Sequence, residues 1–165
     1  MSITREIAAT WRSPRAAIRR QMQAGPREER ILVYLILACF LIFVGQWPRL
    51  ARQAWESDAV PLQALIGAAL FGWMFLAPLF FYALAAFSRL FARMLGGQGS
   101  WFGARLALFW SLLAMAPLWL VQGLVAGFVG PGTILSLVGT MLAVAFLLIW
   151  LLSLAETEAG ATGHA

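Results

Sequence analysis

The stretch ILVYLILACFLIFV, residues 31–44, contains no charged side chain. A helix that is apolar on every side has to be buried in a large core or in a membrane. Extended by a turn from Glu28–Arg30, the stretch reaches the length of about 20 residues that spans a bilayer. Similar apolar runs follow along the chain. The sequence therefore predicts an all-α membrane protein with four transmembrane helices, at about 31–47, 62–88, 104–129 and 133–154.

The composition favours the same class. Hydrophobic residues make up 62% of the 165 residues and charged residues 12%, whereas soluble domains carry about 25% charged residues. A chain of this length has room for one helical bundle and for no sizeable soluble domain. The single cysteine, Cys39, lies within the first predicted span, so the chain can form no internal disulfide.

The ends of the first and last spans are predicted from composition. Trp47 suits the aromatic belt at a membrane interface, and Pro48 predicts that the first helix closes there. Residues 49–60 are then a short polar loop. Residues 156–165 are small and polar, which predicts a disordered tail. The transmembrane bundle is therefore expected to occupy residues 28–155.

The segment LGGQGSW, residues 95–101, is the clearest break between two spans. Gly96 and Gly97 suit the C-terminus of one helix, and Ser100 suits the N-cap of the next. The later segment GPG, residues 130–132, predicts a tight turn. Both breaks place neighbouring spans antiparallel to one another.

The distribution of arginines predicts the orientation of the bundle. Residues 1–30 hold seven arginines and residues 89–105 hold three, whereas residues 49–60 hold two. Short loops rich in basic residues stay in the cytoplasm. Both termini are therefore expected on the cytoplasmic side, which agrees with an even number of spans.

The N-terminal segment, residues 1–27, predicts an amphipathic interfacial helix pair. Ser13 and Pro14 suit an N-cap and a first helical turn, so we expect helices at about 3–12 and 14–24. Apolar side chains share one stripe of this segment: Ile3, Ile7, Trp11, Ile18 and Met22. Trp11 would lie among lipid headgroups, and the basic side chains that would face anionic headgroups are Arg12, Arg15, Arg19 and Arg20. The alternative is a topology signal that needs only charge.

The sequence offers no constellation for chemistry. No charged residue lies in the interior of a predicted span, since Arg105 stands at the very start of the third, and proton relays, ion sites and intramembrane catalytic centres usually need one. We therefore expect no catalytic, cofactor-binding or metal-binding residue, no cofactor and no nucleic-acid partner. The polar groups within or near the spans are expected to bond between helices or to their own backbone. They are Ser88, Ser111, Gln122, Ser136 and Thr140.

Two features predict how the spans pack. Gly123 and Gly127 have the G-x-x-x-G spacing that lets helices approach closely. Pro78 and Pro117 lie near the middle of the second and third spans, where each should kink its helix. Because no polar partner is near either proline in the sequence, we expect both to shape the bundle.

Two segments, WRSPRAAI before the first span and LGGQGSWFGARLALFWSLLAMAPLWL from residue 95, resemble the Yip family of small multi-pass membrane proteins. The residues that carry the resemblance are Trp11, Pro14, Gly96, Gly97, Gly99, Ser100, Trp101 and Pro117. The resemblance covers about 10–155 and implies a bacterial-type Yip domain without a settled activity. Eukaryotic members associate with Rab-type GTPases, a property that is not carried over here. The family usually has five spans, and this sequence predicts four.

These features together predict a non-enzymatic integral membrane protein of a bacterial inner (cytoplasmic) membrane. We expect an accessory subunit that packs against, or helps organise, a larger membrane complex or lipid domain. Its expected partners are anionic lipid headgroups and another integral membrane protein. The alternative is a small transporter or channel subunit, which a polar lining across two or more spans would favour.

Overall fold

The computed structural model describes residues 3–57 and 59–159 of the chain. Within those residues every regular element is a helix. Four helical segments are long and apolar enough to cross a membrane: Glu28–Glu56, Leu62–Met94, Trp101–Phe128 and Thr133–Ala159. The prediction of an all-α protein with four such segments is therefore confirmed.

The elements follow one another with short connections. In chain order they are α1 (Ile3–Arg12), α2 (Pro14–Gln23), α3 (Glu28–Gly45), α4 (Trp47–Glu56), α5 (Leu62–Phe71), the π-helical turn η1 (Gly72–Leu76), α6 (Ala77–Met94), α7 (Trp101–Phe128) and α8 (Thr133–Ala159). The two N-terminal helices have almost the predicted bounds. The predicted end of the N-terminal segment at residue 27 also agrees with the start of α3.

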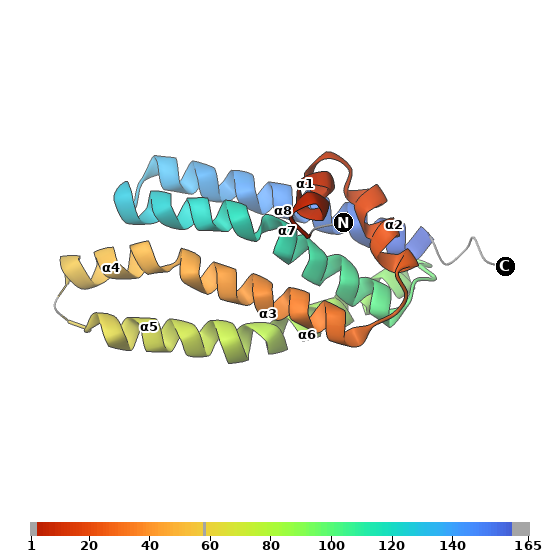
Figure 1. Ribbon diagram of the computed structural model, residues 1–165, viewed down its shortest axis with the longest axis horizontal. Helices are drawn as coiled ribbons and strands as arrows, with labels where there is room; N and C mark the ends of the chain where they lie inside the picture. The colour runs from red at the N-terminus through yellow and green to blue at the C-terminus, as the bar shows by residue number, and fades with distance from the viewer. Residues whose placement is uncertain (1–2, 58, 160–165) are drawn as a thin grey trace.

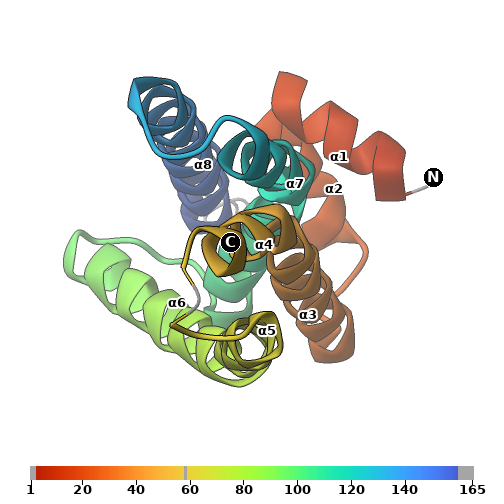
Figure 2. The same cartoon turned by 90° about the vertical axis from the view of Figure 1, so that its left-hand side faces the viewer.

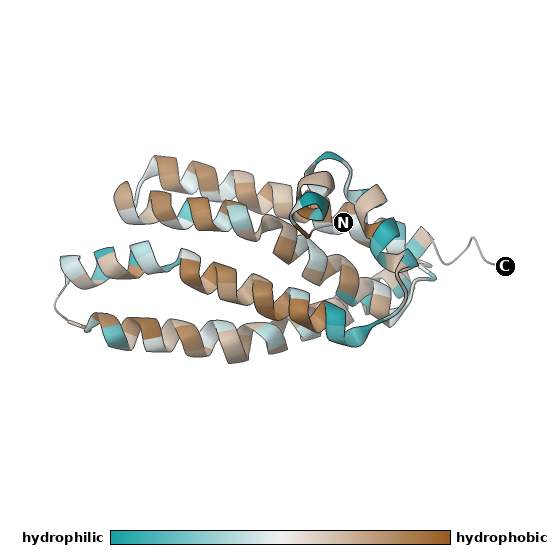
Figure 3. Cartoon of the chain, viewed as in Figure 1, coloured by the Kyte–Doolittle hydropathy of each residue, from teal (hydrophilic) through white to brown (hydrophobic). Residues whose placement is uncertain are grey.

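The four spans alternate in direction along one elongated bundle (Figure 1). The helices α1 and α2, the 95–100 loop and the end of α8 lie at one end, which we call the loop end. The α4–α5 connection and the α7–α8 turn lie at the opposite end, which we call the turn end. Coloured by hydropathy, the spans are mainly hydrophobic, and hydrophilic residues gather near the ends, on α1, α2 and α4 (Figure 3). This pattern is the one expected for a bundle that crosses a bilayer.

Helix α7 forms the centre of the molecule. It packs against α3, α4, α6 and α8, and in the end view it lies between α8 and the α3–α4 segment (Figure 2). Every residue from 106 to 116 is buried, on all sides of the helix. Helices α1 and α2 also contact α7. The N-terminal helices therefore complete the covering of the half of α7 that lies toward the loop end.

The predicted polar loop at 49–60 is wrong. Helix α3 ends at Gly45 and a further helix, α4, begins at Trp47, so Pro48 opens a helix instead of closing one. Proline is favoured in a first turn because its missing N–H has no helical partner there. Arg52 on α4 donates to the carbonyls of Gly127 and Phe128, at 3.1 and 3.2 Å, and so caps the end of α7. Only residues 57–61 connect α4 to α5.

The predicted disordered tail is wrong over residues 156–159. Helix α8 continues to Ala159, and two acidic side chains of its last turns form ion pairs with residues of α2 and α6. The partners are Glu156 with Arg19 and Glu158 with Arg89. Local composition could not reveal partners that are so distant in the chain. The rest of the predicted tail, residues 160–165, lies outside the described residues.

The distortion predicted near Pro78 takes the form of a π-helical turn. The N–H of Ala77 donates to the carbonyl of Gly72, five residues earlier, and Pro78 then stands in the first turn of α6. A π turn is one of the adjustments that rearrange backbone hydrogen bonds around a proline in a membrane helix. Pro117, by contrast, lies inside the continuous helix α7.

Candidate functional site

The glycine loop, residues 95–100, begins with the helix end that the sequence predicts. Gly96 has a φ of 86°, a left-handed conformation that favours glycine. Its N–H donates to the carbonyl of Arg93 at 3.1 Å, and the N–H of Gly97 donates to the carbonyl of Ala92 at 2.9 Å. These two bonds form the Schellman motif that ends α6. The assignment of Gly96 and Gly97 to a helix C-terminus is confirmed.

The loop ends with the predicted N-cap. The Ser100 hydroxyl accepts a hydrogen bond from the N–H of Gly103 at 2.9 Å, and Trp101 is the first residue of α7. The cap satisfies one of the donors that a helix start leaves without an intrahelical partner. Together the Schellman motif and the cap fix the turn between α6 and α7.

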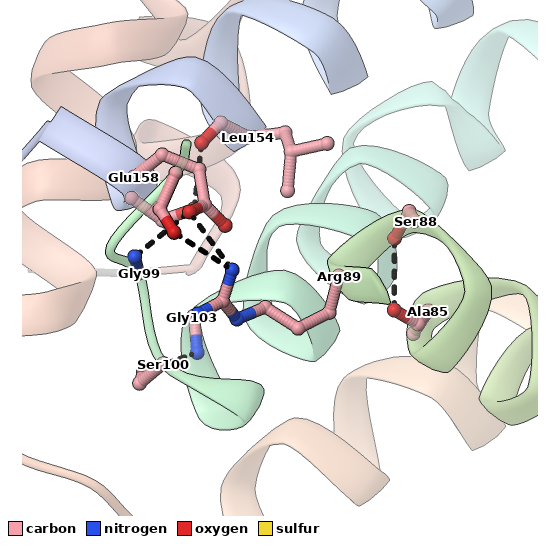
Figure 4. A network of polar contacts seen from close by, with 10 residues as sticks. Ala85, Ser88, Arg89, Gly99, Ser100, Gly103, Leu154 and Glu158 are labelled. Carbon is pink, nitrogen blue, oxygen red and sulfur yellow. Dashed lines mark hydrogen bonds and ion pairs between the residues drawn. The ribbon is translucent and has the colours of Figure 1, made fainter. Parts of the chain in front are cut away.

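An ion pair between Arg89 and Glu158 fills the centre of this loop (Figure 4). The Arg89 guanidinium lies 3.2 Å from the Glu158 carboxylate, and both side chains are nearly buried, at 10% and 13% exposure. The same carboxylate oxygen accepts a hydrogen bond from the N–H of Gly99 at 2.7 Å. The arrangement ties α6, the glycine loop and the end of α8 to one another.

The ion pair explains why two loop positions are glycine. A Cβ at Gly99 would lie 2.6 Å from a Glu158 oxygen, and a Cβ at Gly97 would also overlap this carboxylate. The close approach of backbone to carboxylate therefore requires the absence of side chains. Sequence reasoning missed this cluster because it counted Arg89 only as a basic residue that sets the topology and placed Glu158 in a disordered tail.

The first N-terminal helix docks on the middle of α7 through two tryptophans. Trp110 of α7 donates to the Thr10 hydroxyl at 3.0 Å, and both residues are fully buried. Trp11 donates through its indole N–H to the carbonyl of Ala114 at 2.9 Å. Ala114 lies three residues before Pro117, in the turn where a proline disturbs helical hydrogen bonding. A polar partner near Pro117 therefore exists, contrary to the expectation from the sequence.

The second N-terminal helix, α2, packs on α7 and α8. Ile18 is fully buried, and the Gln21 side-chain oxygen accepts a hydrogen bond from the Tyr34 hydroxyl at 3.1 Å. Arg19 donates to Glu156 at 2.9 Å, and Arg20 pairs with Glu6 at 3.3 Å. The face turned to the bundle thus includes polar Thr10 and Gln21, which the apolar stripe did not predict.

The arginines of the predicted membrane-surface set divide into two groups. Arg19 and Arg20 are engaged in the ion pairs just described. Arg12 and Arg15 are exposed and form no ion pair within residues 3–57 and 59–159. Trp11 remains 46% exposed despite its hydrogen bond to α7. The placement of these side chains at a lipid surface stays a prediction.

The G-x-x-x-G pair forms a contact within the chain. A Cβ at Gly123 would overlap the carbonyl of Gly45, and a Cβ at Gly127 would overlap Pro48. The two glycines therefore let α7 approach the junction between α3 and α4 at backbone distance. The junction supplies a third small residue, because a Cβ at Gly45 would lie 3.3 Å from Leu120.

Three of the hydroxyl groups singled out within or near the spans bond to their own helix, as expected. Ser88 donates to Ala85, Ser111 to Ala107 and Thr140 to Ser136. Gln122 is different, because its half-buried side chain makes no hydrogen bond to any described residue. The described residues also contain no group of three His, Cys, Asp or Glu side chains placed to hold a metal ion.

Comparisons with known proteins add no relative. No protein-family model, curated protein or solved structure matches the chain.

Proposed function

We propose that the chain is a non-enzymatic protein of a bacterial inner membrane, of the Yip type, with both termini in the cytoplasm. In this proposal it acts as an accessory subunit that packs against another integral membrane protein. The loop end, with most of the arginines, faces the anionic headgroups of the cytoplasmic leaflet. Arg12 and Arg15 supply part of this attraction because no acidic side chain within residues 3–57 and 59–159 pairs with them.

The observation that carries the proposal is the uneven burial of the spans. Of the most apolar 18 residues, none is buried in Leu62–Met94 or in Thr133–Ala159, against 44% in Glu28–Glu56 and 50% in Trp101–Phe128. The second and fourth spans therefore leave their apolar faces to other molecules. An apolar cleft of about 470 Å³ between α6 and α8 adds to this open surface.

Small residues on the open spans support a protein partner over lipid alone. Ala64 and Ala68 are exposed four residues apart on α5, and Ser136 and Thr140 are exposed four residues apart on α8. Such pairs allow another helix to approach closely, whereas lipid gains nothing from them. The proposal predicts that a partner helix covers at least one of these pairs.

A photo-crosslinker placed beside each small pair tests the proposal in native membranes. The positions are Phe71 on α5 and Leu137 on α8, which are 58% and 57% exposed, and the control position is Phe109, which is fully buried. We expect p-benzoylphenylalanine at Phe71 or Leu137 to give a discrete protein adduct, and none at Phe109. Ala68→Leu and Thr140→Leu should weaken the adducts at their respective positions by steric clash.

The same crosslinking experiment can contradict the proposal. Adducts of lipid mass alone at both exposed positions, together with a monomeric mass after native extraction, would refute the role of accessory subunit. A homomeric adduct would restrict the partner to a second copy of the chain. Mass spectrometry of the adduct identifies which of these holds.

The second candidate function is a small transporter or channel subunit. It is favoured by a cavity at the turn end, about 540 Å³ in volume, whose lining includes polar side chains from two spans, Gln46 and Gln122. It ranks second because residues 106–116 of α7 are all buried and tightly surrounded. The polar groups of the side chains in this part are the Trp110 indole N–H, which bonds to Thr10, and the Ser111 hydroxyl, which bonds to its own helix. A continuous path would have to open through this packed half.

A further inference from the structure

The cavity at the turn end is assembled by all four spans. Its volume of about 540 Å³ lies within the range of about 300–1,000 Å³ found for small-molecule sites. The residues that matter for recognition are Gln46, Arg49, Trp73, Trp119, Gln122 and Leu135. Arg49 lies in the first turn of α4, just past the end of α3, and Trp73 and Trp119 lie farther from the turn end along their spans. The lining therefore combines one arginine and two amide side chains with aromatic and aliphatic ones.

Two tryptophans line this cavity, one from the π-helical turn and one from the α7 helix just after its proline. Trp73 belongs to the π-helical turn η1, and Trp119 follows Pro117 by two residues in α7. π-helical turns are frequent at functional sites because they rotate side chains out of the helical pattern. The π-helical turn interrupts the second span, whereas the helix around Trp119 continues through Pro117.

The polar groups of the cavity have unused hydrogen-bonding capacity. Gln122 makes no hydrogen bond to a described residue, although a polar group at this depth is destabilising unless it has a partner. The Arg49 guanidinium donates to the Gln46 side-chain oxygen at 3.1 Å. This bond leaves most of the guanidinium donors and the whole Gln46 amide nitrogen available. No acidic residue lines the cavity to balance the charge of Arg49.

We propose that this cavity binds one anionic amphiphile. Its carboxylate or phosphate would accept hydrogen bonds from Arg49 and from the amides of Gln46 and Gln122, because a guanidinium matches both groups. Its acyl chain would lie against Trp73, Trp119 and Leu135. The ligand is either a free fatty acid or an anionic phospholipid from the membrane. This site goes beyond the accessory role and stands whether or not a partner protein is found.

Quenching of tryptophan fluorescence by brominated lipids tests the proposal on the full-length protein in dodecyl maltoside. The probes are a dibrominated fatty acid, brominated phosphatidylglycerol and, as a zwitterionic control, brominated phosphatidylcholine. We expect saturable quenching by at least one anionic probe and only weak, non-saturating quenching by the zwitterionic one. Saturation by the fatty acid alone, or by phosphatidylglycerol alone, would support the site and identify the source of its ligand.

Two sets of variants locate the binding. Trp73→Phe combined with Trp119→Phe should remove the saturable quenching, whereas Trp101→Phe, at the loop end, should keep it. Arg49→Gln should lower the affinity for the anionic probe by at least about tenfold, which is the effect of losing one charge-assisted hydrogen bond. Arg93→Gln removes an exposed arginine at the loop end and should leave the affinity unchanged.

A further substitution keeps the test decisive where the double tryptophan variant does not fold. Gln122→Leu preserves the approximate volume of the side chain and should lower the affinity for the anionic probe several-fold. The proposal is overturned if no anionic probe saturates, or if phosphatidylcholine saturates with equal affinity. It is also overturned if Arg49→Gln and Gln122→Leu, both eluting as folded protein in gel filtration, bind the anionic probe as the unchanged chain does.

Discussion

At the scale of single residues, absent side chains matter most in this bundle. Helix α7 meets the α3–α4 junction at backbone distance because Gly123 and Gly45 face one another. The glycine loop closes on Glu158 because Gly97 and Gly99 leave room for its carboxylate. In both places a methyl group is enough to displace a packed backbone or a nearly buried charge.

The first prediction compares two glycines in helices. Gly123→Ala should destabilise the protein by at least about 2 kcal/mol, because the new Cβ would overlap the Gly45 carbonyl and overpacked contacts of this kind cost about 1–3 kcal/mol or more. Gly67→Ala is the matched control, since its Cβ would meet nothing within 4 Å. It should be neutral or stabilising, as alanine favours helix. Thermal unfolding in detergent measures both, and equal melting temperatures would contradict the close contact.

The second prediction concerns the nearly buried ion pair. Glu158→Gln should destabilise the protein by about 2–4 kcal/mol, because it leaves the Arg89 guanidinium without a countercharge in a nearly dry site. The same substitution at Glu56, whose pair with Arg52 is more exposed, should cost about 0–1 kcal/mol. If the melting temperatures of the two variants fall equally, Glu158 has no special structural role.

At the scale of elements, the N-terminal helices are packed parts of the bundle, because they contact α7 and α8. Helix α1 reaches the turn before Pro117, and its Thr10 hydroxyl satisfies the buried indole of Trp110. Helix α2 is fixed to α8 by Arg19 and Glu156. We refer to α1 and α2 together as the N-terminal arm. The arm covers the half of α7 that the other spans leave open.

The third prediction tests this docking of the N-terminal arm. Thr10→Val should destabilise the docked state by about 1–3 kcal/mol, because it leaves a buried indole N–H without an acceptor. Faster trypsin cleavage after Arg12 and Arg15 would report the undocking. Thr140→Val removes an exposed hydroxyl that bonds to its own helix and should leave cleavage unchanged. Unchanged cleavage in Thr10→Val would show that the arm does not depend on this contact.

At the scale of the whole molecule, four antiparallel spans place the arm, the glycine loop and the end of α8 together. The arginine-rich segments that the sequence assigns to the cytoplasm thus share one end of the bundle. The turn end carries the α4–α5 connection and the α7–α8 turn. The grouping follows from the fold, whereas the side of the membrane that each end faces is part of the proposed function.

The fourth prediction fixes the orientation. Reporter fusions in the 57–61 connection, the 95–100 loop, the 129–132 turn and after residue 165 should read periplasm, cytoplasm, periplasm and cytoplasm. Replacing Arg89, Arg93 and Arg105 with glutamine should reduce this preference, since the rule counts basic residues near span ends. A periplasmic reading at the C-terminus would exclude the four-span topology.

The sequence by itself determined the helical class, the number of segments long and apolar enough to span a membrane, and several helix ends. These properties rest on local causes: apolar length, proline and serine at a helix start, and glycine at a helix end. Helix α3 begins at Glu28, and α1 and α2 meet at Ser13, as the sequence predicts. The Schellman motif at Gly96 and the cap at Ser100 were predictable for the same reason.

Only the tertiary structure decided which polar residues meet. Arg89 and Glu158 are 69 residues apart in the chain, and Trp11 and Ala114 are 103 apart. No periodicity within one helix encodes such a meeting, because it depends on the relative rotation and depth of several packed helices. The same reason explains why the sequence predicted that Gln122 would bond between helices or to its own backbone. Its place in a cavity exists only once all four spans are assembled.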